Sequence, residues 1–206
     1  MKFLYNFLIY AVGLILKFIA LFNPKIKLFV NGRKTVFGTL EKKISKEDKT
    51  IWIHTASLGE FEQGLPVIEK LKKSYPNHKI IVSFFSPSGY EVKKNSPIAD
   101  CIIYLPLDTI KNAKKFITIV HPEISIFVKY EFWPNYLNEL KNSKSKTLLI
   151  SGIFRDDQIF FKNYGKWMRK SLKTFDHFFV QNTKSKELLN SINLKNVTIS
   201  GDTRFD

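Results

Sequence analysis

From Ile51 onward, short apolar runs alternate with segments of helical periodicity. The apolar runs cover Ile51–Ile53, Ile80–Phe85, Cys101–Leu105, Ile124–Val128, Thr147–Ile150, His177–Val180 and Val197–Ile199. The helical patterns between them cover Phe61–Tyr75, Tyr90–Asn95, Ile110–Ile119, Trp133–Lys141, Phe160–Lys173 and Lys184–Asn190. Strands that alternate with helices predict βαβ units, right-handed crossovers and a parallel sheet. We therefore expect an α/β domain over residues 51–206.

The N-terminal segment, residues 1–23, has the pattern of a membrane anchor. Residues 3–22 are mostly apolar, interrupted mainly by Asn6 and Lys17, and their length is close to the about 20 residues that cross a bilayer core. Asn23-Pro24 is expected to end the helix. No small-residue cleavage site follows, which argues against a cleaved signal peptide. The helix is expected to span the membrane or to lie in its plane; a buried core helix is the competing interpretation.

A basic segment, residues 24–50, connects this helix to the α/β domain. Its acidic residues are only Glu41, Glu47 and Asp48, against eight lysines and arginines: Lys25, Lys27, Arg33, Lys34, Lys42, Lys43, Lys46 and Lys49. Basic residues beside a membrane helix indicate the cytoplasmic side and its anionic lipids. We therefore expect a basic juxtamembrane segment, followed by a domain boundary before Ile51.

Composition narrows the class of protein and of partner. The chain is 44% hydrophobic and 25% charged, which is typical of a globular protein. Its net charge of +15 implies an anionic partner, which could be nucleic acid, an acidic membrane surface or a phosphorylated substrate. The only cysteine, Cys101, excludes an intrachain disulfide and lies in an apolar run, so we expect a buried structural thiol.

Several common ligand-binding motifs are absent from the sequence. It has no P-loop, no G-x-G-x-x-G fingerprint, no histidine and cysteine pairs at zinc spacing, and no Asp-x-Asp. P-loop nucleotidases are therefore disfavoured, and no metal or cofactor is expected.

The strongest candidate for chemistry is Glu60. The first predicted strand is followed by a turn through Ser57 and Gly59 into a helix, which places Glu60 in the first helical turn. The carboxyl edge of a parallel sheet is where α/β proteins bind ligands. A carboxylate near the positive end of a helix dipole is favoured in its ionised form, as a general base requires.

Three further polar loops follow predicted strands. They are Ser86-Pro-Ser-Gly89, Lys129-Tyr-Glu-Phe-Trp-Pro-Asn135 and Ser151-Gly-Ile-Phe-Arg155. Ser88 is a plausible helix N-cap, and Gly89 would allow close approach of the backbone to a ligand. Taken singly, each loop has a structural explanation; for example, Arg155 could pair with Asp156 or Asp157. Parallel strands bring these loops to one edge of the sheet. Taken together, the loops therefore favour a ligand-binding or catalytic site there.

These residues, in this order, resemble those of the 3-deoxy-D-manno-octulosonic acid (Kdo) transferases of lipopolysaccharide assembly. The motifs that carry the resemblance are Ser57-Leu-Gly-Glu60, Ser86-Pro-Ser-Gly89, Glu131-Phe-Trp-Pro-Asn135, Gln181-Asn182 and Gly201-Asp-Thr-Arg-Phe-Asp206. The resemblance implies a GT-B glycosyltransferase with two Rossmann-like domains. The chain covers only the N-terminal, acceptor-binding half, and it stops directly after a predicted strand. A C-terminal half that binds the donor is therefore expected to be missing.

The resemblance also implies roles for individual residues. Glu60 matches the family's general base, and Arg204 matches a basic residue that stabilises the transition state. Lys129 stands where many members have the first acid of a Glu-x-Glu, so it is carried over as a catalytic candidate with altered chemistry. The residues expected to bind the acceptor are Ser57, Gly59, Ser86, Ser88, Gly89, Glu131 and Arg155.

The implied activity is transfer of Kdo from CMP-Kdo to a lipid A precursor, lipid IVA, with inversion of configuration. The expected location is the cytoplasmic face of the bacterial inner membrane, with the anionic membrane surface as a further partner and no nucleic acid. Three alternatives stay open. One is a basic nucleic-acid-binding α/β domain, another is a membrane-tethered acceptor-binding module without catalysis, and the third is a GT-B enzyme with another donor or acceptor.

Overall fold

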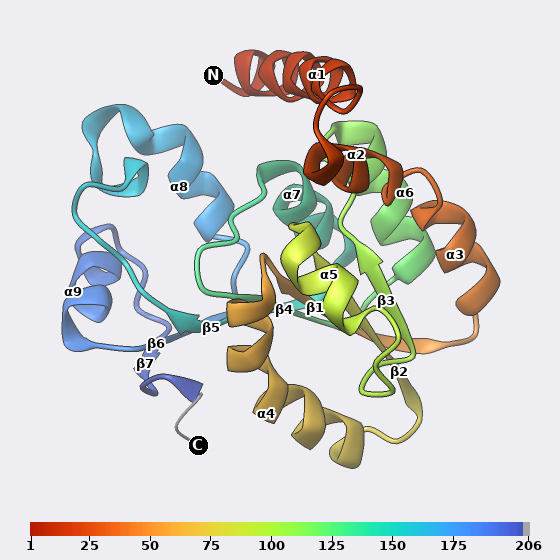
Figure 1. Ribbon diagram of the computed structural model, residues 1–206. Coiled ribbons are helices and arrows are strands. Elements are labelled where there is room, and N and C mark those ends of the chain that lie inside the picture. The colour runs from red at the N-terminus through yellow and green to blue at the C-terminus, as the bar shows by residue number, and fades with distance from the viewer. Residues whose placement is uncertain (204–206) are drawn as a thin grey trace.

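The computed structural model describes residues 1–203, and its centre is a seven-stranded parallel sheet in the order β3-β2-β1-β4-β5-β6-β7 (Figure 1). The strands are β1 Lys49–Thr55, β2 His78–Phe84, β3 Cys101–Tyr104, β4 Ile124–Val128, β5 Lys146–Gly152, β6 His177–Val180 and β7 Val197–Ile199. Every predicted apolar run forms a strand. The expected α/β fold with a parallel sheet is therefore confirmed.

The helices of the described residues differ from the predicted ones mainly at their ends. They are α1 Lys2–Ile19, α2 Pro24–Asn31, α3 Val36–Lys43, α4 Leu58–Ser74, α5 Pro87–Lys93, α6 Ile110–Val120, α7 Pro134–Ser143, α8 Lys166–Leu172 and α9 Thr183–Ser191. The prediction of one helix over 160–173 is wrong, because two 3-10 turns precede α8. The second turn places Gly165 so close to Ile159 that a Cβ would lie 1.6 Å from that carbonyl oxygen.

The sheet is buried on both faces, which explains why its strands read as continuous apolar runs. Ile51 and Ile53 pack with Phe61 and Ile68 of α4 on one face. Trp52 points to the opposite face and belongs to the core formed with α3, α6 and α7. Figure 1 shows α4 and those three helices on opposite sides of the sheet.

The basic segment is more structured than the sequence predicts. Residues 24–50 contain α2 and α3, and Val36, Leu40 and Ile44 lie in the same core as Trp52. The spacing of four residues places Val36 and Leu40 on one face of α3, and Ile44 follows as its C-cap residue. The expectation of a juxtamembrane segment outside the domain is therefore wrong for residues 36–44, because the abundant lysines masked an amphipathic pattern.

The N-terminal helix α1 ends at Ile19, earlier than expected, and Asn23 instead caps α2 by accepting a hydrogen bond from the Ile26 amide. Helix α1 has no buried side chain, and among the described helices it is the one long and apolar enough to cross a membrane. Two polar contacts nevertheless dock it on the domain. The Tyr5 hydroxyl donates to Asp108 at 2.7 Å, and the Asn135 amide donates to Asn6 at 2.8 Å.

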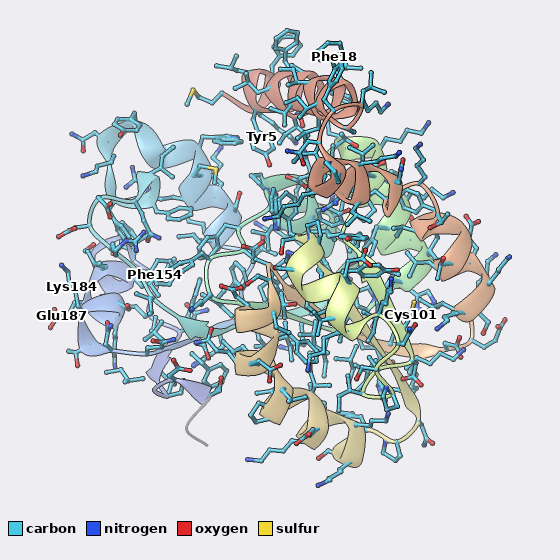
Figure 2. All side chains as sticks on the ribbon, in the orientation of Figure 1. Tyr5, Phe18, Cys101, Phe154, Lys184 and Glu187 are labelled. Atoms are coloured by element: carbon cyan, nitrogen blue, oxygen red, sulfur yellow. The ribbon has the colours of Figure 1, made fainter. Side chains whose placement is uncertain are left out.

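The docked helix exposes its apolar side chains to solvent. Phe3 and Phe18 of α1 are 85% and 65% exposed, and Phe22 in the following turn is 77% exposed. Figure 2 shows Phe18 projecting away from the domain while Tyr5 points toward it. The Tyr5 ring also lies 5.4 Å from the Trp167 ring of α8. The helix therefore lies along the surface of the domain, with one contacting face and one free apolar face.

Two helical glycines provide a test of the packing. A Cβ on Gly89 of α5 would lie 2.3 Å from Phe84 Cδ1 and 3.0 Å from the Leu58 nitrogen, whereas one on Gly38 of α3 would meet nothing within 4 Å. We expect Gly89→Ala to destabilise the protein by about 1–3 kcal/mol through overpacking. Gly38→Ala should be neutral or stabilise it by up to about 1 kcal/mol. Denaturant unfolding of both variants measures the difference, and equal stabilities would contradict this packing.

Candidate functional site

The candidate site lies where the chain reverses direction across the sheet. The connection from β1 leads to β2 on one side, while β4 pairs with β1 on the other, so the segments that follow β1 and β4 diverge. Open parallel sheets bind ligands at such a switch point, outside the carboxyl ends of the strands, and we call this region the crevice. Glu60 enters this region from the first turn of α4 and Lys129 from the end of β4, and their charged groups lie 3.9 Å apart.

Glu60 is held by its neighbours but remains accessible. The Ser57 hydroxyl donates a hydrogen bond to Glu60 Oε2, while Oε1 faces the Lys129 ammonium. The Glu60 side chain is 17% exposed. This arrangement leaves a positioned carboxylate open to a ligand, as a proton acceptor requires.

Lys129 owes its position to an unusual backbone conformation. Its amide still donates to the Ile150 carbonyl at 3.0 Å, as in a strand, but its φ of 66° is left-handed. That conformation is uncommon for a residue with a Cβ. It turns the chain sharply away from the sheet and carries Lys129 toward the first turn of α4.

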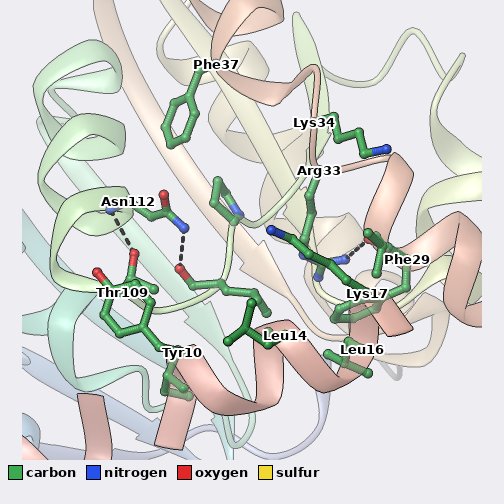
Figure 3. Close-up of a pocket in the computed structure, with 15 residues that line it drawn as sticks. Tyr10, Leu14, Leu16, Lys17, Phe29, Arg33, Lys34, Phe37, Thr109 and Asn112 are labelled. Carbon is green, nitrogen blue, oxygen red and sulfur yellow. Dashed lines mark hydrogen bonds between the residues drawn. The ribbon is translucent and has the colours of Figure 1, made fainter. Parts of the chain in front are cut away.

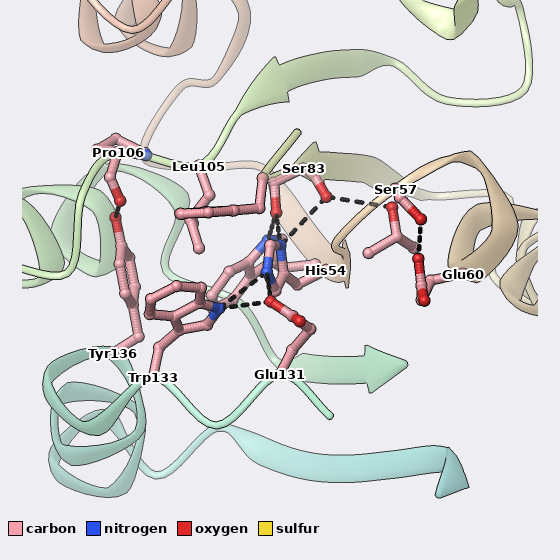
Figure 4. Close-up of polar contacts among 12 residues, drawn as sticks. His54, Ser57, Glu60, Ser83, Leu105, Pro106, Glu131, Trp133 and Tyr136 are labelled. Carbon is pink, nitrogen blue, oxygen red and sulfur yellow. Dashed lines mark hydrogen bonds and ion pairs between the residues drawn. The ribbon is translucent and has the colours of Figure 1, made fainter. Parts of the chain in front are cut away.

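Glu131 belongs to a buried polar network (Figure 4). His54 Nε2 lies 3.0 Å from Glu131 Oε2, and the Trp133 indole nitrogen donates to the same oxygen at 2.8 Å. On the other side of the ring, His54 Nδ1 lies 2.9 Å from the Ser83 hydroxyl, which also accepts from Trp52 Nε1 at 2.8 Å. The network runs from the core face of the sheet to the crevice.

One tautomer of His54 allows hydrogen bonds to both Glu131 and the Ser83 hydroxyl. With its proton on Nε2, His54 donates to Glu131 and accepts from the Ser83 hydroxyl at Nδ1. Trp133 then donates to the second lone pair of the same carboxylate oxygen. His54 is fully buried and Glu131 is not. The histidine therefore positions a carboxylate that faces the crevice.

Replacing His54 by a residue without ring nitrogens tests its role in this hydrogen-bond network. We expect His54→Phe to destabilise the fold by about 1–3 kcal/mol, because the buried Ser83 hydroxyl and the Glu131 carboxylate each lose one of their hydrogen-bond partners. The control is His177→Phe, since His177 is the half-buried first residue of β6 and its Nε2 bonds the Thr198 hydroxyl of β7. Thermal unfolding compares them, and a His54 variant no less stable than the His177 variant would argue against a structural network.

The loop after β2 packs against the crevice. Its Phe85 and Ser86 amides donate to the carbonyls of Thr55 and Ala56, and the Phe85 ring lies 4.7 Å from the Trp133 ring. Ser86, not Ser88, is the N-cap residue of α5, so the predicted cap is wrong, because the helix begins at Pro87. The Ser86 and Ser88 hydroxyls bond each other at 2.6 Å. Buried Gly89 packs against protein, and its proposed approach to a ligand stays a prediction.

The loop after β5 contributes a more peripheral cation. Arg155 is exposed and pairs with Asp157 at 3.6 Å, and its guanidinium lies 5.7 Å from the centre of the Tyr130 ring. Ser151, left-handed at φ 50°, bonds the Thr203 hydroxyl at 2.8 Å. The predicted residue Arg204 lies outside the residues that the structure describes.

Asp108 is an important residue that the sequence pattern did not indicate. It is 1% exposed and accepts hydrogen bonds from the Asn135 and Tyr136 amides at 3.1 and 3.0 Å, in the first turn of α7. Its third donor is Tyr5 of α1. Burial raises the pKa of Asp108 more than these bonds lower it, and burial beside Asp108 also raises the pKa of Tyr5. One carboxyl group thus joins the N-terminal helix to the loop that carries Glu131.

Within residues 1–203, no cluster of three or more histidine, cysteine, aspartate or glutamate side chains is placed to hold a metal ion. The expectation of a metal-independent reaction stays a prediction. Cys101 is buried, as expected, and burial raises the pKa of its thiol.

Solved structures with this architecture include two UDP-N-acetylglucosamine 2-epimerases. The putative enzyme from Listeria monocytogenes matches with a TM-score of 0.56 and 12% identity, over 76% of this chain and 45% of that one. The enzyme from Methanocaldococcus jannaschii matches with a TM-score of 0.54 and 14% identity, over 76% and 46%. At these identities the likeness concerns the fold alone. It confirms the expected Rossmann-like sheet of a GT-B-like protein.

Curated relatives share more sequence. The 3-deoxy-D-manno-octulosonic acid transferase of Aquifex aeolicus is 31% identical over 157 residues, covering 75% of this chain and 40% of that protein. The enzyme of the same name from Chlamydia pneumoniae is 28% identical over 90% of this chain and 44% of its own length. A bifunctional glycosyltransferase/methyltransferase of Fusobacterium nucleatum is 29% identical over 82% and 26%. The chain thus spans less than half the length of these relatives.

The family model described as 3-deoxy-D-manno-octulosonic-acid transferase (kdotransferase) matches residues 31–206. The match covers the crevice and every loop that supplies it, and it confirms the resemblance inferred from the motifs. The chain therefore belongs to the 3-deoxy-D-manno-octulosonic-acid transferase family.

Proposed function

We propose that the protein containing this chain transfers Kdo from CMP-Kdo to a lipid A precursor, lipid IVA, and that this chain supplies the acceptor-binding half with the general base. The observation that supports the proposal best is the position of Glu60. Its carboxylate stands at the switch point of the sheet, held by Ser57, faced by Lys129 and open to the crevice.

In the proposed mechanism, Glu60 removes the proton from a glucosamine hydroxyl of the acceptor. The oxygen attacks the anomeric carbon of Kdo, and CMP leaves with the electron pair of the broken bond. Attack opposite the leaving group inverts the configuration. The hydrogen bond from Ser57 fixes one oxygen of Glu60, and we propose that the other, which lies 3.9 Å from the Lys129 ammonium, meets the hydroxyl. Pre-positioning of this kind lowers the barrier by removing the need to orient the base during the reaction.

Cations around the crevice suit a phosphorylated acceptor. Lys129 faces the crevice, and we propose that it contacts a phosphate or carboxylate of a substrate rather than acting as an acid stabiliser. Arg204 is proposed to offset charge that develops in the transition state. Ser57, Gly59, Ser86, Ser88, Gly89, Glu131 and Arg155 remain the proposed acceptor-binding residues.

The docked α1 favours an in-plane anchor. A helix whose Tyr5 and Asn6 bond the domain cannot cross a bilayer while those contacts hold, whereas its free apolar face can enter the interface. We propose that α1 and the basic residues beside it hold the protein on the cytoplasmic face of the inner membrane. There, lysines and arginines near the surface attract anionic lipids.

The test is a transfer assay with the full-length protein, CMP-Kdo and lipid IVA in detergent. Mass spectrometry should show the acceptor gaining Kdo, and chain 1–206 alone should bind the acceptor without turning it over. If the full-length protein binds lipid IVA but transfers nothing, it is an acceptor-binding module. If the protein instead binds duplex or single-stranded nucleic acid in a filter-binding assay, with an affinity that falls steeply as salt rises, the proposal fails.

A further inference from the structure

A cavity lies under the N-terminal helix, and none of the candidate site residues lines it. It has a volume of about 360 Å³, within the range of small-molecule sites. Its walls come from α1, α2, α6 and the β3–α6 loop (Figure 3). Most of the lining is apolar and includes Leu14, Val30, Pro106 and Leu107.

The cavity opens beside exposed apolar residues of α1. Leu14 lines it and is also 67% exposed, so it stands at the opening. Leu21 and Phe22 continue the exposed surface at 74% and 77%. A hydrocarbon chain that meets this face in a membrane therefore has an apolar route into the cavity, which lies behind the helix.

One end of the cavity is cationic. Lys17 and Arg33 both line it there, whereas Figure 3 shows Lys34 pointing away. Arg33 donates to three carbonyls, those of Phe29, Leu105 and Phe85, at 2.6–2.8 Å. Among residues 1–203, neither Lys17 nor Arg33 pairs with a carboxylate. Burial lowers the pKa of Arg33 to about 9, which leaves it charged at neutral pH.

A partly buried cation without a counter-ion, beside an apolar cavity, is complementary to an amphiphilic anion. We propose that this cavity binds one acyl chain of an anionic membrane phospholipid, with the lipid phosphate at Lys17 and Arg33. The site is separate from Glu60 and goes beyond the proposed transfer reaction. The bound lipid would contact both α1 and the domain, and so hold the helix at the membrane surface.

Photocrosslinking in vesicles tests the site with the 206-residue chain. The probe is phosphatidylglycerol with a diazirine in one acyl chain, compared with phosphatidylcholine carrying the same chain, in otherwise identical vesicles. Peptide mapping should find the phosphatidylglycerol label on Pro106 and Leu107, which lie behind α1. Label confined to exposed residues such as Phe18 and Phe22 would overturn the proposal, since it would show only insertion in the bilayer.

Two pairs of variants separate chain binding from headgroup binding. Val30→Phe narrows the cavity and should abolish most labelling of Leu107, whereas Leu21→Phe, the control on the exposed surface, should not. Lys17→Ala should reduce the preference for phosphatidylglycerol about fivefold, and Lys73→Ala, exposed on α4 on the far side of the sheet from α1 (Figure 1), should leave it unchanged. Equal effects within either pair would refute the site. Thermal melts check folding, and the assay contains no CMP-Kdo, so its outcome is independent of transfer activity.

Discussion

Replacing Glu60 by glutamine should reduce kcat for Kdo transfer by about 10²- to 10⁴-fold, the range typical of general-base assistance. The amide can still accept the hydrogen bond from Ser57. It cannot accept a proton from the attacking hydroxyl. Because the side chain is partly exposed at the start of α4, the fold should be unchanged. The measurement is steady-state transfer by the full-length protein, with unfolding curves recorded alongside.

The matched control is Glu62→Gln, two residues further along α4. Glu62 pairs with Lys93 at 3.0 Å and is 44% exposed, so it loses the same charge outside the crevice. Its kcat should stay within a factor of a few of the unaltered enzyme, because exposed ion pairs contribute little. Near-normal turnover by the Glu60 variant would remove that residue from the role of base. Equal losses in both variants would point to general electrostatics.

Replacing Asp108 by alanine should destabilise the protein by about 3 kcal/mol, since a helix cap is lost and two buried amides lose their acceptor. The N-cap residue Trp133 provides no side-chain cap for α7, so Asp108 is the acceptor that the described structure supplies to Asn135 and Tyr136. For a chain of this size the change corresponds to a drop in Tm of roughly 6–12 °C.

Tyr5→Phe separates the two functions of Asp108. It removes the hydrogen bond from α1 but leaves the cap of α7 intact, so its cost should be about 1 kcal/mol. Limited proteolysis should cut both variants near residues 20–23, because α1 has lost part of its attachment. Thermal melts in detergent give the stabilities. A Tm for Asp108→Ala within about 2 °C of that of Tyr5→Phe would show that the cap contributes little.

The elements of the sheet could be read from the sequence because each depends on local pattern. Apolar runs gave the strands, and the turn after Ile53 placed Glu60 correctly on the first helical turn. The pairing of Glu60 with Lys129 follows from strand order, which the motifs alone do not specify. The loops expected to meet at one edge do meet there, and whether their side chains bind the acceptor stays a prediction.

The partners of these side chains could not be predicted, because they are distant in the chain. His54 and Glu131 are 77 positions apart, and Asp108 and Asn135 are 27 apart. One indirect signal exists for Asp108. A helix that begins with Trp133 and Pro134 has no capping side chain of its own, so its amides need an acceptor from elsewhere. Which of many aspartates supplies it depends on tertiary packing.

The chain contains three tryptophans, and each lies in a different environment. Trp52 is fully buried in the core, Trp133 stacks on Phe85 beside the crevice, and Trp167 touches Tyr5 of α1. Single-tryptophan variants would therefore give three separate optical reporters. Emission from Trp167 would follow release of the anchor, that from Trp133 would follow occupancy of the crevice, and that from Trp52 would change only on global unfolding.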